Sequence, residues 1–465
     1  MIPVEWAFAT IRELGQRLRA RETTSLALTE FFLERLERIG TQHNAVVTLT
    51  RDLALRQARQ ADAELSTGRD RGPLHGIPYG AKDLLAVTGY PTTWGAAPFR
   101  EQTFDADAAV ITRLRDAGAV LVAKLAMIEL AGGFGYRQAN SSFTGPALCA
   151  WDKTRWAGGS SSGSGIAVGA GLVPFAVGSE TSGSILNPAA ANGISGFRPT
   201  YGRVPRTGAM ALSWTLDKLG PMCRTADDCG LVLQAIAGPD EVDFTTIPES
   251  YRYEPGTAEL SSIRIGVIEG CVANVQPEVK SAFEVAIEDL KQFAKVETAA
   301  LPDLPYGAVV GTIINGEMAA AFEEFIRSGK VLELTAPEDR WGGYSVLVMP
   351  AKDYVNALRI RRQIQVAIDK LLVDYPILIA PTMATVAGPI DRDFREWSRG
   401  FGSSPLGTAG NAAGLPGISV SMGPGADGLP TALQLVAGAR QENLLLQIAA
   451  EYQRRTDWHR QHPAV

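Results

Sequence analysis

The feature that most restricts what this chain can fold into is a pair of glycine-rich, serine-bearing turns separated by an apolar run. The first turn, GGSSSGS, covers residues 158–164, the second, GSETSGS, covers residues 178–184, and residues 166–177 between them are mostly apolar. Glycine at this density lets the backbone turn tightly and approach another molecule closely, and the apolar run predicts a buried element that supports both turns. The serines of these turns are therefore candidate nucleophiles.

Three other interpretations of this segment are weaker. A flexible linker is disfavoured because apolar residues separate the turns and continue after the second one. A phosphate-binding loop would need a lysine after its last glycine, and neither turn has one. Residues 159–163 match the G-x-S-x-G nucleophile elbow of α/β-hydrolases with Ser161 as nucleophile, but no apolar strand precedes them. An elbow also needs a later histidine, and both later ones, His459 and His462, lie in a polar tail.

A serine nucleophile needs a base, and histidine is scarce in this chain. There are four histidines, none of them in a zinc-binding pattern such as H-E-x-x-H. A lysine can act as the base if burial removes its proton near neutral pH. Lys82 lies in the segment LHGIPYGAKDLL, residues 74–85, between glycines and apolar residues, whereas most other lysines lie among charged residues. Lys82 is therefore the candidate base.

With these residues in place, the chain resembles the amidase signature family of serine hydrolases. The resemblance rests on the segments GIPYGAKDLLAVTGYPTTWG, GGSSSGSGIAVGAGLVPFAVGSETSGSI and GFRPTYGRVPRTGAMALSWTLDKLGPMCRTADDC, and it continues through DAGAVLVAKLAMIEL, NAAGLPGISVSMG and GLPTALQLVA. It covers nearly the whole chain, with the motifs in the family's order. The fold that it implies is α/β, with a mixed central β-sheet sandwiched between helical layers.

The resemblance also implies roles for individual residues. It makes Ser184 the nucleophile that forms an acyl-enzyme, Ser160 the bridging serine and Lys82 the base, with a cis peptide bond before Ser160. It implies an oxyanion hole made by backbone N–H groups, those of Thr181, Ser182, Gly183 and Ser184. We expect no cofactor and no metal.

Glu180, Ser182 and Leu186 depart from the family pattern. The family's second turn usually reads D-T-G-G-S, with an arginine two residues after the nucleophile, where this chain has Leu186. An arginine there would be a natural partner for a substrate carboxylate. We therefore expect a small neutral substrate and disfavour glutamine. By resemblance and position, the expected pocket residues are Met127, Gly132, Gly133, Leu186 and Trp341.

Hypotheses from three classes of function follow. The first is a free-standing amidase that hydrolyses an amide, an aryl amide or a carbamate, in the last case a urethanase. The second is the catalytic A-type subunit of a glutamine-dependent amidotransferase, which would need partner chains. The third is an inactive scaffold, which the presence of Lys82, Ser160 and Ser184 disfavours. We expect the first.

Composition restricts the partners and the location. The 465 residues are 46% hydrophobic and 20% charged, with a net charge of −6, which is typical of a globular protein that acts on small molecules. We expect an amide or carbamate substrate, no nucleic acid, no membrane, and a monomer or homodimer. Four cysteines without short paired spacing, and no apparent signal peptide, predict a reduced cytoplasmic protein.

The chain has no internal repeat or linker, so we expect a single amidase domain over residues 1–465. Its expected parts are an N-terminal helical layer (1–66), a catalytic signature region (67–237), and a variable helical cover that also completes the sheet (238–465). Apolar periodicity predicts helices at 11–18, 25–39, 51–65, 106–117, 127–134, 225–237, 279–293 and 442–455, and strands at 77–81, 120–123, 175–177, 263–268, 295–300, 377–382, 417–421 and 432–436. Residues 306–372 are expected to be mainly helical, with an interruption at 335–343.

Overall fold

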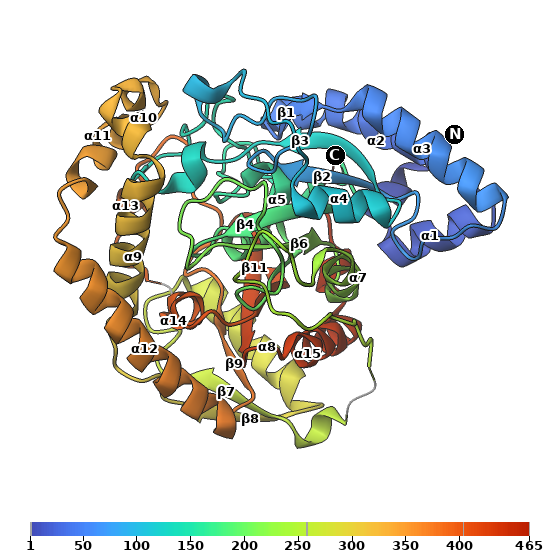
Figure 1. Ribbon diagram of the computed structural model, residues 1–465. Coiled ribbons are helices and arrows are strands. Elements are labelled where there is room, and N and C mark those ends of the chain that lie inside the picture. Colours follow the sequence, from blue (N-terminus) through green and yellow to red (C-terminus); the bar gives the residue numbers. More distant parts are fainter. Residues whose placement is uncertain (1, 257–258, 403, 465) are drawn as a thin grey trace.

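A single mixed sheet of eleven strands forms the centre of the molecule in the computed structural model, which describes residues 2–256, 259–402 and 404–464 (Figure 1). The strand order is β1-β3-β2-β4-β6-β5-β10-β11-β9-β7-β8. The strands are β1 (Val46–Leu49), β2 (Pro78–Lys82), β3 (Val120–Leu125), β4 (Phe175–Glu180), β5 (Ser195–Arg198), β6 (Lys218–Cys223), β7 (Arg264–Ile268), β8 (Lys295–Ala299), β9 (Ile377–Pro381), β10 (Gly417–Pro424) and β11 (Pro430–Ala437). Neighbouring strands in the middle of the sheet therefore come from distant parts of the chain.

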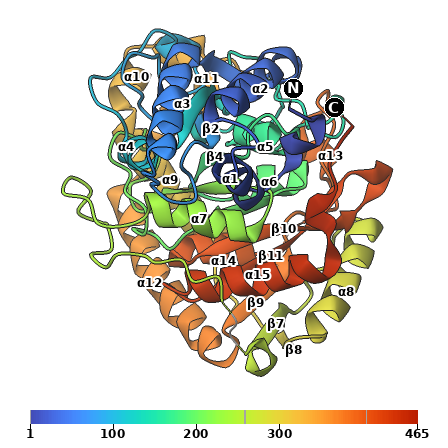
Figure 2. The same ribbon diagram turned by 90° about the vertical axis from the view of Figure 1, so that its right-hand side faces the viewer.

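Fifteen α-helices surround this sheet in the described part of the chain (Figures 1 and 2). They are α1 (Ile11–Arg19), α2 (Ser25–Arg38), α3 (Arg51–Ser66), α4 (Ala109–Asp116), α5 (Ser162–Gly169), α6 (Leu186–Asn192), α7 (Ala226–Ile236), α8 (Pro277–Lys291), α9 (Tyr306–Ala321), α10 (Glu323–Arg327), α11 (Pro337–Val346), α12 (Ala351–Asp374), α13 (Phe394–Trp397), α14 (Leu406–Ala413) and α15 (Glu442–Thr456). None of the described helices is both long enough and apolar enough to cross a bilayer. The α/β class and the sheet between helical layers are confirmed.

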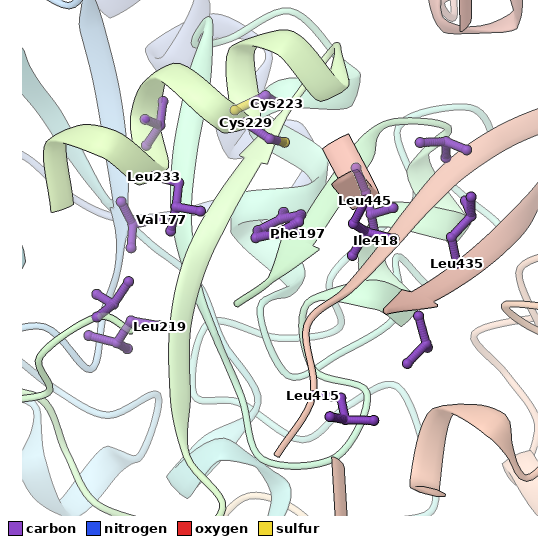
Figure 3. Packing of buried hydrophobic residues seen from close by; sticks show 14 of the residues in the cluster. Val177, Phe197, Leu219, Cys223, Cys229, Leu233, Leu415, Ile418, Leu435 and Leu445 are labelled. Carbon is purple, nitrogen blue, oxygen red and sulfur yellow. The ribbon is translucent and has the colours of Figure 1, made fainter. Parts of the chain in front are cut away.

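Both faces of the sheet are buried, because successive side chains of β4 pack into two different apolar clusters. Phe175 and Val177 belong to one apolar cluster, and Ala176 between them belongs to a second cluster on the other face. Figure 3 shows the first cluster, where side chains of β4, β5, β6, β10 and β11 meet those of α7 and α15. Covered faces explain why these strands are apolar runs rather than alternating apolar and polar residues.

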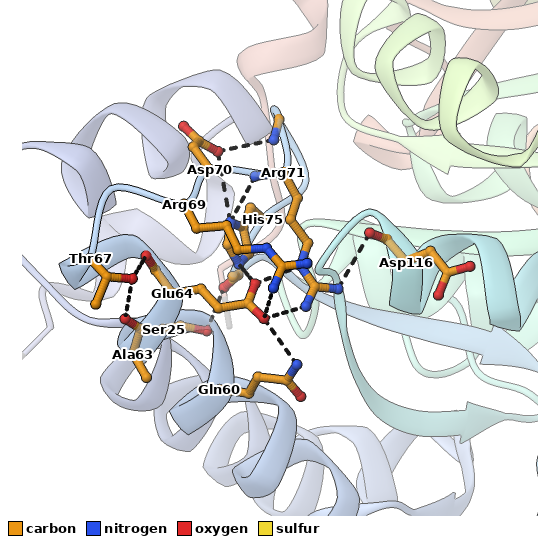
Figure 4. Close-up of polar contacts among 12 residues, drawn as sticks. Ser25, Gln60, Ala63, Glu64, Thr67, Arg69, Asp70, Arg71, His75 and Asp116 are labelled. Carbon is orange, nitrogen blue, oxygen red and sulfur yellow. Dashed lines mark hydrogen bonds and ion pairs between the residues drawn. The ribbon is translucent and has the colours of Figure 1, made fainter.

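Polar contacts attach the N-terminal helices to the rest of the molecule (Figure 4). Glu64, near the end of α3, accepts hydrogen bonds from the Arg71 guanidinium and from Gln60. The buried imidazole of His75 accepts the Arg71 backbone N–H through Nδ1 at 3.0 Å. The Arg71 hydrogen bonds lower the pKa of Glu64 to about 2, so its carboxylate stays charged over the physiological pH range.

Most predicted elements are present, with the two helical predictions nearest the site in error. Residues 127–134 do not form an α-helix; Glu129–Gly132 is a short 3₁₀ turn in which Leu130 and Ala131 have positive φ. Helix α11 occupies most of residues 335–343, where an interruption was predicted. The helical structure is interrupted instead just before α11 and at residues 347–350. The short strands β1, β5 and β6, and helices α5, α6, α13 and α14, were not predicted.

Candidate active site

The candidate catalytic residues meet where two parallel strands end. β2 and β4 are parallel neighbours, with Tyr79 opposite Phe175 and Ala81 opposite Val177. Lys82 is the last residue of β2, and Ser179 lies one residue before the end of β4. The carboxyl ends of parallel strands open into a crevice where α/β proteins commonly bind ligands. The first turn leads directly into α5, which begins at Ser162.

Lys82 is fully buried and is surrounded by hydroxyl groups. Its Nζ lies 2.8 Å from Ser160 Oγ, 2.9 Å from Ser179 Oγ and 3.0 Å from Ser161 Oγ. Burial lowers the pKa of Lys82 to about 7, although Asp217 and Glu180 act in the opposite direction. A neutral amine is thus available near neutral pH, as a base must be.

The hydroxyl network favours one orientation of the neutral amine. Ser161 Oγ donates to the carbonyl oxygen of Ser179 at 3.1 Å, so it can only accept from Lys82. A neutral amine has two N–H groups and one lone pair. If the N–H groups go to Ser161 and Ser179, the lone pair faces the Ser160 hydroxyl. Glycine at 178 permits this arrangement, because a Cβ there would lie 2.9 Å from Ser161 Oγ.

The second turn places Ser184 beside the first. The Ser184 carbonyl accepts the Ser161 N–H at 3.2 Å, and the Gly159–Ser160 peptide is cis, as the resemblance implied. Gly183 has φ +90°, which favours glycine. In the part of the chain that the structure describes, the N–H groups of residues 181–184 donate to no protein acceptor. They are therefore free to meet a substrate oxygen.

The Glu180 carboxylate fixes the second turn through hydrogen bonds to the backbone that follows it. Its Oε2 accepts the N–H groups of Ile185 and Leu186 at 2.9 and 3.0 Å. Its Oε1 accepts from Arg198 and Asn411 at 2.8 and 2.9 Å. Burial would raise the pKa of Glu180, but the charge of Arg198, the Lys218 ammonium and these hydrogen bonds lower it to about 2. The glutamate at 180 thus provides a fixed carboxylate under the second turn.

A buried ion pair fixes the end of β2. Lys124 Nζ lies 2.7 Å from Asp83 Oδ1, and both side chains are fully buried. Asp83 also accepts the Thr93 N–H at 3.0 Å. Because Asp83 directly follows Lys82, this pair fixes the backbone that carries the candidate base.

A cavity of about 280 Å³ opens beside this network. Ser179, which contacts Lys82, lines this cavity together with Thr181, Asp217, Arg206 and Asp243. Arg206 is already engaged, because Nε and Nη2 lie 3.1 and 3.2 Å from the two Asp243 oxygens. The rest of the lining is largely apolar and includes Met210, Leu212, Trp214 and Leu219. A larger surface hollow of about 630 Å³ contains none of the candidate catalytic residues.

The five expected pocket residues do not line this cavity. Met127 is fully buried, and Leu186 is 2% exposed within the apolar cluster of α5 and α6. Gly132 and Gly133 lie beside the lining residue Ala131, and Gly133 backs onto Leu212. Trp341 is 67% exposed. Position 186 begins helix α6, and its side chain packs into the core, which weakens the argument that the missing arginine at 186 sets the charge of the substrate.

Sequence reasoning missed several residues that complete the site. Ser179 and Ser161 belong to the serine-rich turns, but their contact with Lys82 depends on how β2 and β4 pair. Asp217, which accepts the Thr181 hydroxyl at 2.6 Å, and Asn411 carry no local sign of such a role.

Among the described residues, no group of three or more His, Cys, Asp or Glu side chains could hold a metal ion.

Comparison with known proteins places this geometry in context. The family model described as Amidase matches residues 27–446. The A subunit of the glutamyl-tRNA(Gln) amidotransferase from Roseiflexus sp. (strain RS-1) is 38% identical, with 98% of each chain covered. The native peptide amidase of Stenotrophomonas maltophilia superposes with a TM-score of 0.88 at 31% identity, with 98% of each chain covered. The corresponding A subunit from Thermotoga maritima gives 0.81 at 25% identity, covering 100% of this chain and 98% of that one.

Proposed function

Because this chain belongs to the Amidase family, we propose that it hydrolyses its substrate through an acyl-enzyme on Ser184. The chain is a hydrolase of carbon–nitrogen bonds. The observation that carries the proposed mechanism is the buried Lys82 amine, 2.8 Å from the Ser160 hydroxyl and with a pKa of about 7. An amine at this pKa removes a proton efficiently near neutral pH.

The proposed proton path combines the contact of Lys82 with Ser160 and the roles that the family resemblance gives to Ser160 and Ser184. Lys82 takes the Ser160 proton while Ser160 takes that of Ser184, and Ser184 Oγ bonds to the substrate carbonyl carbon. The carbonyl oxygen becomes an oxyanion that the N–H groups of residues 181–184 can stabilise, each donor contributing about 3–4 kcal/mol. The C–N bond then breaks as the relay returns a proton to the leaving nitrogen. Water hydrolyses the ester by the same relay, releasing the acid and restoring Ser184.

For the substrate, the comparisons favour the amidotransferase hypothesis over a free-standing amidase. Curated relatives at 33–38% identity over 98% of the chain are glutamyl-tRNA(Gln) amidotransferase A subunits. The sequence-based objection to this role was the leucine at 186, and it loses its force because that side chain is buried away from the cavity. We therefore propose glutamine as the amide donor, with partner chains that use the released ammonia.

A free-standing amidase remains the second candidate, and one feature of the cavity favours it. Arg206 is the only cationic side chain on the described lining, and Asp243 already pairs with it. The largely apolar remainder suits a neutral amide or carbamate better than a carboxylate, whose unpaired burial is costly. This role would suit a monomer or homodimer. Both candidates are compatible with a cytoplasmic location, which remains part of the proposal.

Ammonia release by the purified chain alone separates the two candidates. Glutamine and hexanamide are compared at equal concentration, with Ser184→Ala as the control for contaminating activity. A higher kcat/KM for glutamine supports the amidotransferase role, and a higher value for hexanamide supports the free-standing amidase. A Ser184→Ala variant as active as the wild type would overturn the proposed chemistry altogether.

A further inference from the structure

Two buried carboxyl groups join the cavity wall to helix α11. Glu129, in the turn Glu129–Gly132, and Asp339, in α11, are both fully buried. Both Asp339 oxygens are without a hydrogen-bond partner when the group is treated as a carboxylate. Two unprotonated carboxylates in one dry site would repel each other strongly, so a shared proton is the natural solution.

Glu129 anchors the beginning of α11. Its Oε2 accepts the Thr335 N–H and its Oε1 the Ala336 N–H, both at 2.8 Å. On the other side of the same segment, Arg340 Nε donates to the Leu334 carbonyl at 2.7 Å. α11 then continues against Phe134, since a Cβ on Gly342 would lie 1.8 Å from the Phe134 carbonyl oxygen. The helix is therefore seated directly on the segment that follows the cavity wall.

The same turn is bonded to the candidate catalytic residues. Ile128, immediately before Glu129, donates its N–H to the Ser160 carbonyl at 3.2 Å. Ala131, two residues after Glu129, lines the cavity and has φ +57°. A movement of Glu129 would therefore displace Ile128, which is bonded to Ser160, and Ala131, which lines the cavity.

We propose that Glu129 and Asp339 share one proton and act as positioning residues, the Asp339 carboxyl donating to the Glu129 carboxylate. The shared proton holds α11 on the turn that carries Ala131 and contacts Ser160. Loss of the proton leaves two buried carboxylates side by side, and their repulsion displaces α11 from this turn. Amide hydrolysis, which is itself proposed, is only one way to detect this proton. The folded protein would hold the proton whatever substrate it hydrolyses.

The groups around Asp339 agree with a retained proton. Burial, with smaller contributions from Glu129 and Glu338, raises the pKa of Asp339 to about 9. The side chain of Tyr136 is half-buried, and its pKa is raised by desolvation and by Asp339. Among the described residues no salt bridge involves Glu129 or Asp339; Lys330 and Glu333 are exposed, and Arg340 is engaged by carbonyl groups.

The test compares Asp339→Asn with Asp339→Ala, with the exposed Glu333→Gln as matched control. Asparagine keeps a neutral donor facing Glu129, so this variant should recover most of the neutral-pH kcat/KM that alanine loses, about 10- to 100-fold. In the wild type and in Glu333→Gln, kcat/KM should fall above pH 9; in Asp339→Asn this fall should be absent. An unchanged alkaline fall in Asp339→Asn, or a loss equal to that of Asp339→Ala, would overturn the proposal.

Thermal unfolding provides a readout that is independent of catalysis. Because the folded state keeps a proton that the unfolded chain releases above pH 4, the stabilisation from Asp339 decreases as pH rises towards 9. The wild-type Tm should therefore fall between pH 7 and 9.5 by more than that of Asp339→Asn. Equal falls in the two proteins would refute the shared proton even if the chain proved inactive on every amide.

Discussion

Removing the Ser179 hydroxyl tests whether the network around Lys82 orients its lone pair. Ser179 Oγ lies 2.9 Å from Lys82 Nζ, and in the proposed orientation it receives one of the two amine N–H groups. Ser179→Ala leaves Ser160, Ser161 and Ser184 in place. The variant should therefore keep the nucleophile and lose only one of the contacts that fix the base.

The size of the effect follows from the difference between charged and neutral hydrogen bonds. A hydrogen bond to a charged group contributes about 1.5–3 kcal/mol and a neutral one about 0.5–1.5 kcal/mol. Losing the acceptor therefore disfavours the ammonium relative to the amine by about 1–1.5 kcal/mol, which lowers the pKa of Lys82 by about one unit. Because the proposed mechanism uses the neutral amine, the acid limb of kcat/KM should move from about pH 7 towards pH 6. The plateau should fall about tenfold or more, since a misdirected lone pair transfers protons poorly.

The assay is a profile of kcat/KM from pH 5 to 9 on whichever amide the wild type hydrolyses. Ser164→Ala is the matched control, because Ser164 is also a buried serine, and its hydroxyl donates to the Val177 carbonyl instead of touching Lys82. The control should keep the wild-type midpoint. A Ser179→Ala profile that coincides with the wild type in both midpoint and plateau would refute the orientation argument.

Three further outcomes are expected. Ser184→Ala should lower kcat by about a million-fold, and mass spectrometry should find a fluorophosphonate label on Ser184 of the wild type; a label on Ser161 would instead support the nucleophile elbow. Lys124→Ala should lower the free energy of unfolding by about 3–5 kcal/mol in a urea titration, because it leaves Asp83 buried and unpaired; a change below about 1 kcal/mol would contradict this. Leu186→Arg should lower the urea midpoint without shifting selectivity towards carboxylated amides, because position 186 is 2% exposed in an apolar cluster; a stable variant with a new preference for glutamine would show that the side chain reaches substrate.

The sequence was sufficient for the fold class, most long elements and the turns that carry the candidate catalytic residues. Apolar periodicity and glycine-rich turns depend on neighbouring residues alone, so they predict local structure without knowledge of the tertiary fold. The residues that line the cavity differ from the expected pocket residues because lining depends on side-chain direction: Leu186 is close to Ser184 in sequence, yet its side chain at the start of α6 packs into the core. The contact of Ser179 with Lys82 likewise requires the pairing of β2 with β4, which no single stretch of sequence specifies.

The strand order also has a consequence for how the protein is made. Lys82, Ser160 and Ser184 all leave the ribosome well before Asn411, which bonds Glu180 and lies 2.8 Å from Lys218 through its Oδ1. β5 likewise takes β10 as a neighbour, so the middle of the sheet closes only after residues 417–424 have been synthesised. A growing chain thus carries all three candidate catalytic side chains, together with Arg198, while the Glu180 carboxylate under the second turn still lacks its hydrogen bond from Asn411. Translation arrested before residue 411 would release a chain with the whole signature and no assembled site.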